Sequence, residues 1–185
     1  MVFVGRLAKP KNPLFMIDIL ACLKERSVSL LMMGGGELDT PLRAYAKSKE
    51  VEHLVTFAGP LPHCEALKAF CSARVAVMPS LWEGLPILPK EAGYLGLPVV
   101  AAAIPGVDEI IEDGKNGFLI PTYDPKLYAA ATNRLLDDPS LALKMGAQGK
   151  QRVDRRFLRR HNTQAFIDIY HSALRNMLTA SQVKK

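Results

Sequence analysis

Two glutamates, Glu83 and Glu91, stand eight residues apart in the stretch 80–92, which reads SLWEGLPILPKEA. The first falls in a loop that contains a glycine, and the second falls in the helix expected to follow that loop. Both carboxylates can therefore reach the hydroxyl groups of a ligand at the start of the helix, where free N–H groups and the helix dipole favour phosphate. Two carboxylates can also act as a general acid and a general base, so the pair alone leaves both chemistries open.

Two cations, Arg6 and Lys11, follow the first apolar run of the chain. A guanidinium binds phosphate oxygens with two parallel hydrogen bonds and an ammonium adds a point charge, so the pair suits a diphosphate. Taken by themselves, both are also ordinary surface cations. The predicted chemistry is diphosphate binding beside the two carboxylates.

Three successive glycines, 34–36, follow the second apolar run. Glycine lets a backbone approach a ligand closely, but it can also simply end a strand before a helix. The run is not a G-x-G-x-x-G fingerprint and it follows the second strand, so a nicotinamide or flavin site is not expected. The chain also lacks G-x-x-x-x-G-K-[ST], which excludes a P-loop nucleotidase.

The elements that must position these residues are short apolar strands separated by single helices. This alternation predicts an α/β fold, namely a Rossmann-like doubly wound parallel sheet of about six strands with a helical C-terminal tail. In such sheets ligands bind at the carboxyl ends of the strands, where the cations, the glycines and the Glu83 loop all fall. Strands are expected at 2–4, 29–33, 54–57, 75–78, 98–102 and 117–120, and helices at 13–23, 38–48, 64–71, 87–95, 125–137, 139–155 and 160–178.

These blocks, in this order, resemble the C-terminal half of glycosyltransferase family 4 (group 1) enzymes, which have the GT-B fold and bind the sugar donor in that half. The matching segments are VGRL at 4–7 with Lys11, MGGGE at 33–37, FAG at 57–59, the E-x7-E pair, and GLPVV at 96–100. One departure is Asn12, which stands where the family commonly has glycine.

The resemblance implies that the ligand is a nucleoside-diphosphate sugar and that the chain is a hexosyl-type transferase acting with retention on a polysaccharide or lipid-linked acceptor. Arg6 and Lys11 would stabilise the leaving diphosphate without a metal or other cofactor, Glu83 would bind the sugar, and Glu91 the ribose. Glu83 is then not a glycosidase-type acid or nucleophile. The further donor-binding positions implied are Gly5, Gly34, Gly36, Phe57, Gly59, Gly84, Leu85 and Pro86.

The domain organisation expected from this resemblance is one half of a GT-B enzyme. Residues 1–180 would form the donor-binding domain, residues 181–185 a disordered tail, and the N-terminal acceptor domain would be absent. The isolated chain is then expected to have little transferase activity. Two alternatives remain open, namely a non-catalytic sugar-nucleotide-binding subunit or remnant of a split enzyme, and a sugar-nucleotide epimerase on the same fold.

The net charge of +6 is unevenly distributed, because residues 150–160 hold six basic side chains and one acidic one. On a continuous helix five arginines would share one side: Arg152, Arg155, Arg156, Arg159 and Arg160. This side is either a solvated face or a contact for anionic lipid headgroups or a phosphorylated acceptor. No aromatic residues alternate with the arginines, so a nucleic-acid platform is not expected.

Composition places the chain in the cytoplasm, with peripheral contact to the inner membrane face as an option. No apolar run approaches the roughly 20 residues that span a bilayer. The three cysteines match no zinc pattern, and Cys22 and Cys71 are expected to be buried thiols in a reducing compartment. The four histidines form no metal-binding pair, so no metal site is expected.

Overall fold

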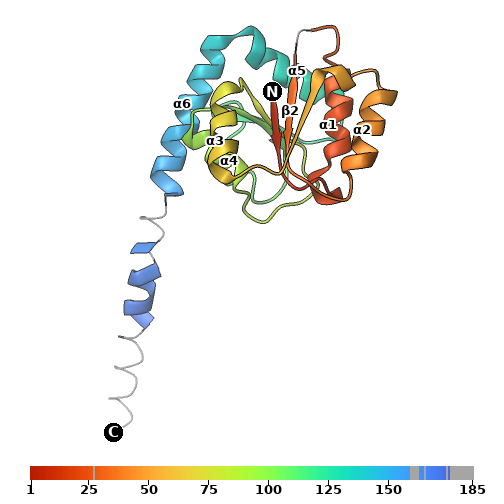
Figure 1. Ribbon diagram of the computed structural model, residues 1–185. Coiled ribbons are helices and arrows are strands. Elements are labelled where there is room, and N and C mark those ends of the chain that lie inside the picture. The colour runs from red at the N-terminus through yellow and green to blue at the C-terminus, as the bar shows by residue number, and fades with distance from the viewer. Residues whose placement is uncertain (27, 159–162, 165, 174, 176–185) are drawn as a thin grey trace.

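The structure is a computed structural model that describes residues 1–26, 28–158, 163–164, 166–173 and 175 (Figure 1). Its centre is a six-stranded parallel sheet with the strand order β3-β2-β1-β4-β5-β6. The strands are β1 (Val2–Val4), β2 (Leu30–Met33), β3 (Val55–Gly59), β4 (Ala76–Met78), β5 (Val99–Ala102) and β6 (Gly117–Ile120). The chain winds outward from β1 in one direction and from β4 in the other, which confirms the predicted doubly wound sheet and gives a crevice between β1 and β4.

Helices cover both faces of the sheet. They are α1 (Pro13–Ala21), α2 (Asp39–Ser48), α3 (His63–Ser72), α4 (Leu88–Tyr94), α5 (Pro125–Asp137) and α6 (Pro139–Arg156), with short 3₁₀ turns η1 (Lys9–Lys11) and η2 (Glu52–Leu54). In Figure 1, α1 and α2 lie side by side on one side of the sheet and α3 and α4 on the other. Leu20, Leu42 and Tyr128 belong to the core under α1, α2 and α5, whereas Phe70 and Ala92 belong to the core under α3 and α4.

The last two regular helices begin at aspartates that cap them. The Asp124 carboxylate accepts a hydrogen bond of 2.9 Å from the Lys126 N–H, and the Asp138 carboxylate accepts one of 2.9 Å from the Leu141 N–H. Each cap is followed by a proline, whose missing N–H and fixed φ suit the first position of a helix. These local signals explain why the helices expected at 125–137 and 139–155 form where they do.

Helix α6 packs directly against α4 through glycines. A Cβ at Gly146 would lie 1.8 Å from the Gly96 carbonyl oxygen, and one at Gly149 would lie 3.3 Å from the Gly93 Cα. No side chain separates the two backbones at these points. The glycines of α6 are therefore required for this close helix–helix contact.

Three regions of the second half of the chain bear on the sequence prediction. Residues 103–116, all of which are described, connect β5 to β6 through turns and contain no helix, and no helix was predicted there. Helix α6 ends at Arg156, so the arginines do not form one continuous helical side. The predicted residues Arg159, Arg160 and 181–185 lie outside the described residues. The described residues between 163 and 175 are helical, and they fall within the helix predicted at 160–178.

The expectation that Cys22 and Cys71 are buried is wrong, because both side chains are exposed and free, as is Cys64. Helix α1 ends at Ala21, so Cys22 follows the last helical residue and faces outward. In α3 the buried residue is Phe70, and Cys71, rotated by about 100° around the helix, points to solvent. In the described part of the chain, no helix is both long and apolar enough to cross a bilayer.

Candidate functional site

A cleft of about 380 Å³ opens at the carboxyl ends of β1 and β4. This volume lies within the usual range for a small-molecule site, about 300–1,000 Å³. Its position is the crevice that a doubly wound sheet offers to ligands. The cleft is lined by Phe3, Val4, Lys11, Met78, Ser80, Glu83, Gly84, Leu85, Pro86, Ile87, Leu88 and Glu91.

The charged centre of the cleft is an ion pair between Lys11 and Glu83. The Lys11 ammonium donates to a Glu83 carboxylate oxygen at 2.5 Å, with side chains 31% and 10% exposed. The loops that carry them are joined by a 2.8 Å hydrogen bond from the Leu81 N–H to the Pro10 carbonyl. Sequence reasoning assigned both residues to the site, and the structure brings them together.

The turn that leads from Lys11 into α1 depends on Asn12. This residue has φ 52° and ψ 49°, in the left-handed region. Asparagine tolerates this region better than other residues with a Cβ. Asn12, at the position where the resemblance implies a glycine, therefore adopts a conformation that glycine adopts readily.

The glycines after β2 serve contact between loops. A Cβ at Gly34 would lie 1.9 Å from the Gly5 carbonyl oxygen, and one at Gly36 would lie 2.4 Å from the Leu7 carbonyl oxygen. The Leu7 N–H also donates to the Gly35 carbonyl at 3.0 Å. The two glycines hold the β2 loop against the loop that carries Lys11, and neither of them lines the cleft.

The Glu83 loop is held from the other side by the β5 loop. A Cβ at Gly106 would lie 1.6 Å from the Gly84 carbonyl oxygen. Gly84 itself has open space on its Cβ side. The N–H groups of Gly84 and Leu85 find no acceptor among the residues that the structure describes, so both can donate to a ligand in the cleft.

Helix α4 begins at Leu88, one residue later than the predicted start at Ile87. Pro86 is buried in the preceding loop, and Pro89 occupies the first turn of the helix, where a missing N–H costs nothing. Glu91 follows within one turn and lines the cleft. The two glutamates thus lie on a loop and a helix, as predicted.

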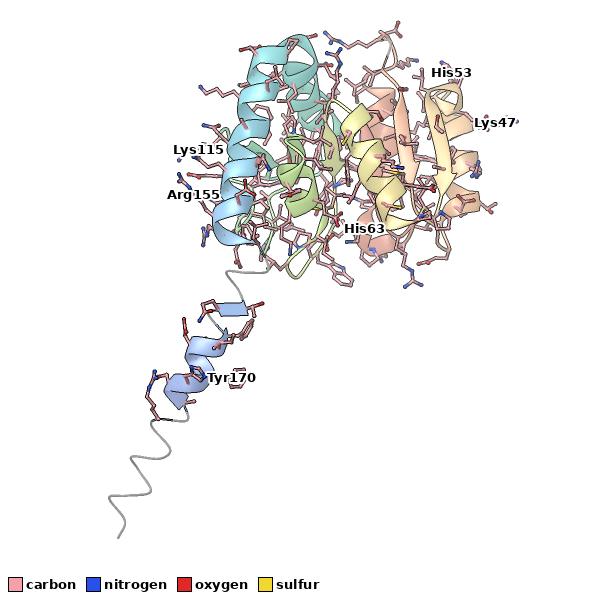
Figure 2. All side chains as sticks on the ribbon, turned by 60° about the vertical axis from the view of Figure 1, so that its left-hand side comes forward. Lys47, His53, His63, Lys115, Arg155 and Tyr170 are labelled. Carbon is pink, nitrogen blue, oxygen red and sulfur yellow. The ribbon has the colours of Figure 1, made fainter. Side chains whose placement is uncertain are left out.

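Sequence reasoning missed His63 as a site residue. Its Nε2 lies 2.6 Å from a Glu91 carboxylate oxygen, although the imidazole is 70% exposed. His63 is the first residue of α3 (Figure 2). The available signal was its place just after β3, at the same carboxyl edge of the sheet as the other site residues.

Ser80, the first residue of the stretch that holds both glutamates, was not predicted as a site residue, but its surroundings single it out. Its hydroxyl is buried and has no hydrogen-bond partner in the described structure, while it belongs to the lining of the cleft. Its carbonyl accepts a hydrogen bond of 2.8 Å from the Tyr123 hydroxyl. Burial raises the pKa of Tyr123, which keeps this donor protonated. A buried unpaired hydroxyl is a position that a water or ligand atom would satisfy.

Besides Gly34 and Gly36, four more of the predicted positions lie outside the cleft lining. Arg6 is exposed on the β1 loop. Gly5 faces the Lys11 side chain, and a Cβ there would lie 3.5 Å from Lys11 Cδ. The Phe57 ring packs at the edge of the core under the Arg43 guanidinium, 4.3 Å away. Gly59 has φ 69° and its carbonyl accepts from the Gly34 N–H at 2.8 Å.

Within the described ranges, no three His, Cys, Asp or Glu side chains come together as metal ligands. Among the described residues, Lys11 is the cation in the cleft lining. The arrangement can neutralise a diphosphate with Lys11, accept hydrogen bonds from hydroxyl groups with Glu83 and Glu91, and donate backbone N–H groups at 84–85.

Residues 1–152 match the family model described as glycosyl transferases group 1. A D-inositol 3-phosphate glycosyltransferase of Corynebacterium urealyticum is 30% identical over 179 residues, which cover 92% of this chain and 42% of the relative. The corresponding protein of Acidothermus cellulolyticus is 31% identical over 191 residues, covering 97% and 42%. The chain thus spans about two fifths of the length of these curated relatives.

Solved structures share the fold. Sucrose-phosphate synthase from Thermosynechococcus elongatus superposes with a TM-score of 0.86 at 25% identity, over 95% of this chain and 45% of that one. Anabaena HepE in complex with UDP-glucose gives a TM-score of 0.84 at 24% identity, over 92% and 48%. The pneumococcal O-GlcNAc transferase GtfA, in complex with UDP and GlcNAc, gives 0.81 at 25%, over 94% and 35%.

Proposed function

The chain belongs to the group 1 glycosyltransferases, and we propose that it binds a nucleoside-diphosphate sugar in the cleft of Lys11, Glu83 and Glu91. The observation that carries this proposal is the Lys11–Glu83 ion pair at the crevice of the sheet. It places a cation for phosphate and an acceptor for sugar hydroxyls within one site. The GT-B fold supports the same placement of the donor.

Lys11 supplies the main charge stabilisation in this proposal. As the bond between sugar and diphosphate breaks, negative charge grows on the departing phosphate oxygen, and a fixed ammonium next to it lowers the barrier. Arg6 stands exposed on the same loop and would turn toward the diphosphate when the donor binds. These two cations would act in place of a metal, and no cofactor is proposed.

Glu83 and Glu91 bind hydroxyl groups. With Lys11 at 2.5 Å, the Glu83 carboxylate is held as an acceptor, which suits sugar hydroxyls better than attack on the anomeric carbon. Glu91, at the neighbouring edge of the cleft, would accept from the ribose, beside His63. The free N–H groups of Gly84 and Leu85 would complete the contacts to the donor.

The base of the donor is proposed from the solved neighbours. The Anabaena and pneumococcal proteins are described with UDP or a UDP-sugar. Uridine is therefore the base to test first. Phe57, one of the donor-binding positions that the resemblance implies, does not line the cleft. We therefore place the base beside His63, at the start of α3.

The acceptor half would come from a second domain or partner chain. The curated relatives are more than twice as long as the matched region, which spans 42% of each. Apolar side chains around the cleft loop, Trp82, Leu85 and Ile87, are exposed and would be covered by such a domain. We propose transfer with retention to a polysaccharide or lipid-linked acceptor in the cytoplasm, with residues 1–180 as the donor-binding domain.

Donor binding is tested by isothermal titration of the 185-residue chain with UDP-, GDP- and ADP-sugars. A true donor at 100 times its Kd should also stabilise the fold by about 2.7 kcal/mol. Lys11→Met and Glu83→Gln should abolish the binding, whereas Lys9→Met, an exposed lysine of the same turn outside the cleft lining, should retain it. Failure of all three donor classes to bind the unaltered chain would overturn the proposal.

Transfer itself is tested by adding a candidate acceptor domain. Turnover that requires both parts supports an enzyme half. Donor binding without turnover under any pairing would favour a non-catalytic sugar-nucleotide-binding subunit. Conversion of the free donor sugar without an acceptor, followed by NMR, would instead show an epimerase.

A further inference from the structure

A second concavity, of about 250 Å³, lies on the flank of the molecule between the loop 112–116 and α6. It shares no lining residue with the cleft at Lys11. Figure 2 shows Lys115 from the loop and Arg155 from α6 side by side on this flank. The lining side chains that could donate hydrogen bonds to an anion include Lys115, Gln148, Gln151, Arg152, Arg155 and Arg156. We call this concavity the flank pocket.

The helical residues of the flank pocket share one side of α6. Positions 148, 151, 152 and 155 follow the i, i+3, i+4, i+7 spacing that places side chains on a common face. This face bears two guanidinium and two amide groups directed at one volume. A single ligand can therefore contact donors from successive turns.

The charge of the flank pocket is strongly positive. Four cations and one carboxylate, Glu112, line it, which gives a net charge of +3. The hydrogen bond from Lys115 lowers the pKa of Glu112, so this carboxylate is ionised at neutral pH and neutralises only one of the cations. Arg155 has no ion-pair partner among the residues described. An anion of charge near −2 would neutralise most of this net charge.

Arg152 is fixed in place and still lacks a partner for one donor. Its Nη2 donates to the Glu109 carbonyl at 2.9 Å and its Nη1 lies 3.4 Å from Glu112, so the guanidinium is held at the base of the pocket with the side chain 21% exposed. Its Nε is buried and has no hydrogen-bond partner in the described structure. A buried N–H of this kind calls for an acceptor.

We propose that the flank pocket binds a phosphomonoester group through Arg152, Arg155 and Lys115. A phosphomonoester carries a charge of about −1.5 to −2 at neutral pH and three acceptor oxygens, which matches the positive field and the several donors. Guanidinium groups bind such oxygens with paired hydrogen bonds, and the amides of Gln148 and Gln151 can donate to the outer ones. The volume lies below the usual range of small-molecule sites, about 300–1,000 Å³, and fits a phosphate with its nearest atoms.

The test uses inorganic phosphate as the probe and the 185-residue chain as the protein, followed by NMR chemical shifts of Gln148, Gln151 and the arginine Nε groups. Saturable shifts at these groups are expected. Arg155→Gln removes an exposed, unpaired cation and should weaken binding at least tenfold without unfolding the chain. Lys115→Gln, on the loop, should weaken it as well.

The matched control is Lys144→Gln. Lys144 lies on the same helix, about 16 Å along its axis from Arg155, and does not line the flank pocket. It undergoes the same change of charge and should leave phosphate binding unchanged. Shifts that do not saturate, or equal weakening by Arg155→Gln and Lys144→Gln, would show general attraction to a basic surface and would overturn the proposal.

The source of the phosphate is distinguished with vesicles. Vesicles of phosphatidylcholine with phosphatidic acid present a phosphomonoester headgroup, and those with phosphatidylserine carry negative charge without one. Binding to phosphatidic acid that is lost in Arg155→Gln would assign the pocket to a lipid headgroup. Binding of inorganic phosphate without binding to either vesicle would assign it to a free phosphate compound. Equal binding to both vesicles that is insensitive to Arg155→Gln, with no saturable phosphate site, would overturn it.

Discussion

Lys11 and Glu83 lie 72 residues apart in the chain, yet their charged groups are 2.5 Å apart in the cleft. The contact joins the β1 loop to the β4 loop, on the two sides of the point where the strand order reverses. Because Glu83 is only 10% exposed, Lys11 also compensates a carboxylate that has been partly removed from water. The pair therefore contributes to the fold as well as to the proposed site.

Removing one member of this pair should destabilise the protein. Lys11→Met leaves the Glu83 carboxylate without its cation, at a cost of roughly 1–3 kcal/mol, the range for losing a partner of a partly buried polar group. Glu83→Gln in the Lys11→Met background should recover part of that loss. Urea denaturation of the two single variants and the double variant measures the coupling, and strictly additive losses would contradict it.

Glu91 should matter for donor binding much more than an exposed glutamate nearby. Glu91→Gln keeps the shape but removes the charged acceptor, so we expect about tenfold weaker binding, equivalent to about 1.4 kcal/mol. Glu65→Gln on α3 is the control, because Glu65 is exposed and does not line the cleft. Titration with the donor identified for the unaltered chain gives both values. Equal affinities for the two variants would remove Glu91 from the site.

The contact between Gly106 and Gly84 should be essential for placing the Glu83 loop. A Cβ at Gly106 would meet the Gly84 carbonyl oxygen at 1.6 Å, so Gly106→Ala must displace one of the two loops. Gly114→Ala is a matched control, because Gly114 has a similar φ of 71° but open space around it. The control should lose about 1–2 kcal/mol from the left-handed conformation alone.

Gly106→Ala should lose more stability than the control and should also lose donor binding. Thermal denaturation and titration of both variants test this difference. If Gly106→Ala bound donor as well as Gly114→Ala, the β5 loop would not determine the position of Glu83.

The ion pair between Arg26 and Asp137 should make part of the folding stability sensitive to acid. It joins the segment after α1 to the end of α5. Its two hydrogen bonds measure 2.6 and 3.0 Å. The hydrogen bond from Arg26 lowers the pKa of Asp137 below its usual 3.8 in the folded state. The stabilisation is therefore complete above the unfolded pKa and is lost as the pH falls through the lower, folded value.

Asp137→Asn should lower the urea midpoint at pH 7, and its effect should shrink progressively as the pH falls below 3.8 and the carboxyl group becomes protonated in the folded state as well. Glu25→Gln, the same change of charge one residue from Arg26, serves as the control and should have little effect over the same pH range. A difference between Asp137→Asn and the unaltered chain that persists in acid would assign the effect to packing.

The alternating pattern of short apolar strands and helices was sufficient to predict the sheet, because both faces of a parallel sheet are buried and its strands are uniformly apolar. The β5–β6 connection was predicted without a helix and contains none, yet Val107 and Ile111 within it belong to the core under α3 and α4. Burial of apolar residues therefore does not require a helix.

The candidate site was predicted unevenly for a physical reason. Lys11, Glu83 and Glu91 could be found because charged residues after buried strands must converge at one edge. His63 has no such pattern, since a single exposed histidine is uninformative until its Glu91 partner is known. Gly34 and Gly36 were assigned to a ligand, whereas the structure shows them meeting the backbone of another loop, and sequence alone does not distinguish a ligand from a neighbouring loop.

The glycine contacts between α4 and α6 have a mechanical consequence. Where Gly93 meets Gly149 and Gly96 meets Gly146, backbone touches backbone, and no flexible side chain is available to absorb a displacement. The two helices are therefore expected to shift together rather than separately. Because Glu91 lies on α4 and Arg152 on α6, the packing of α6 also fixes the helix that forms one wall of the cleft.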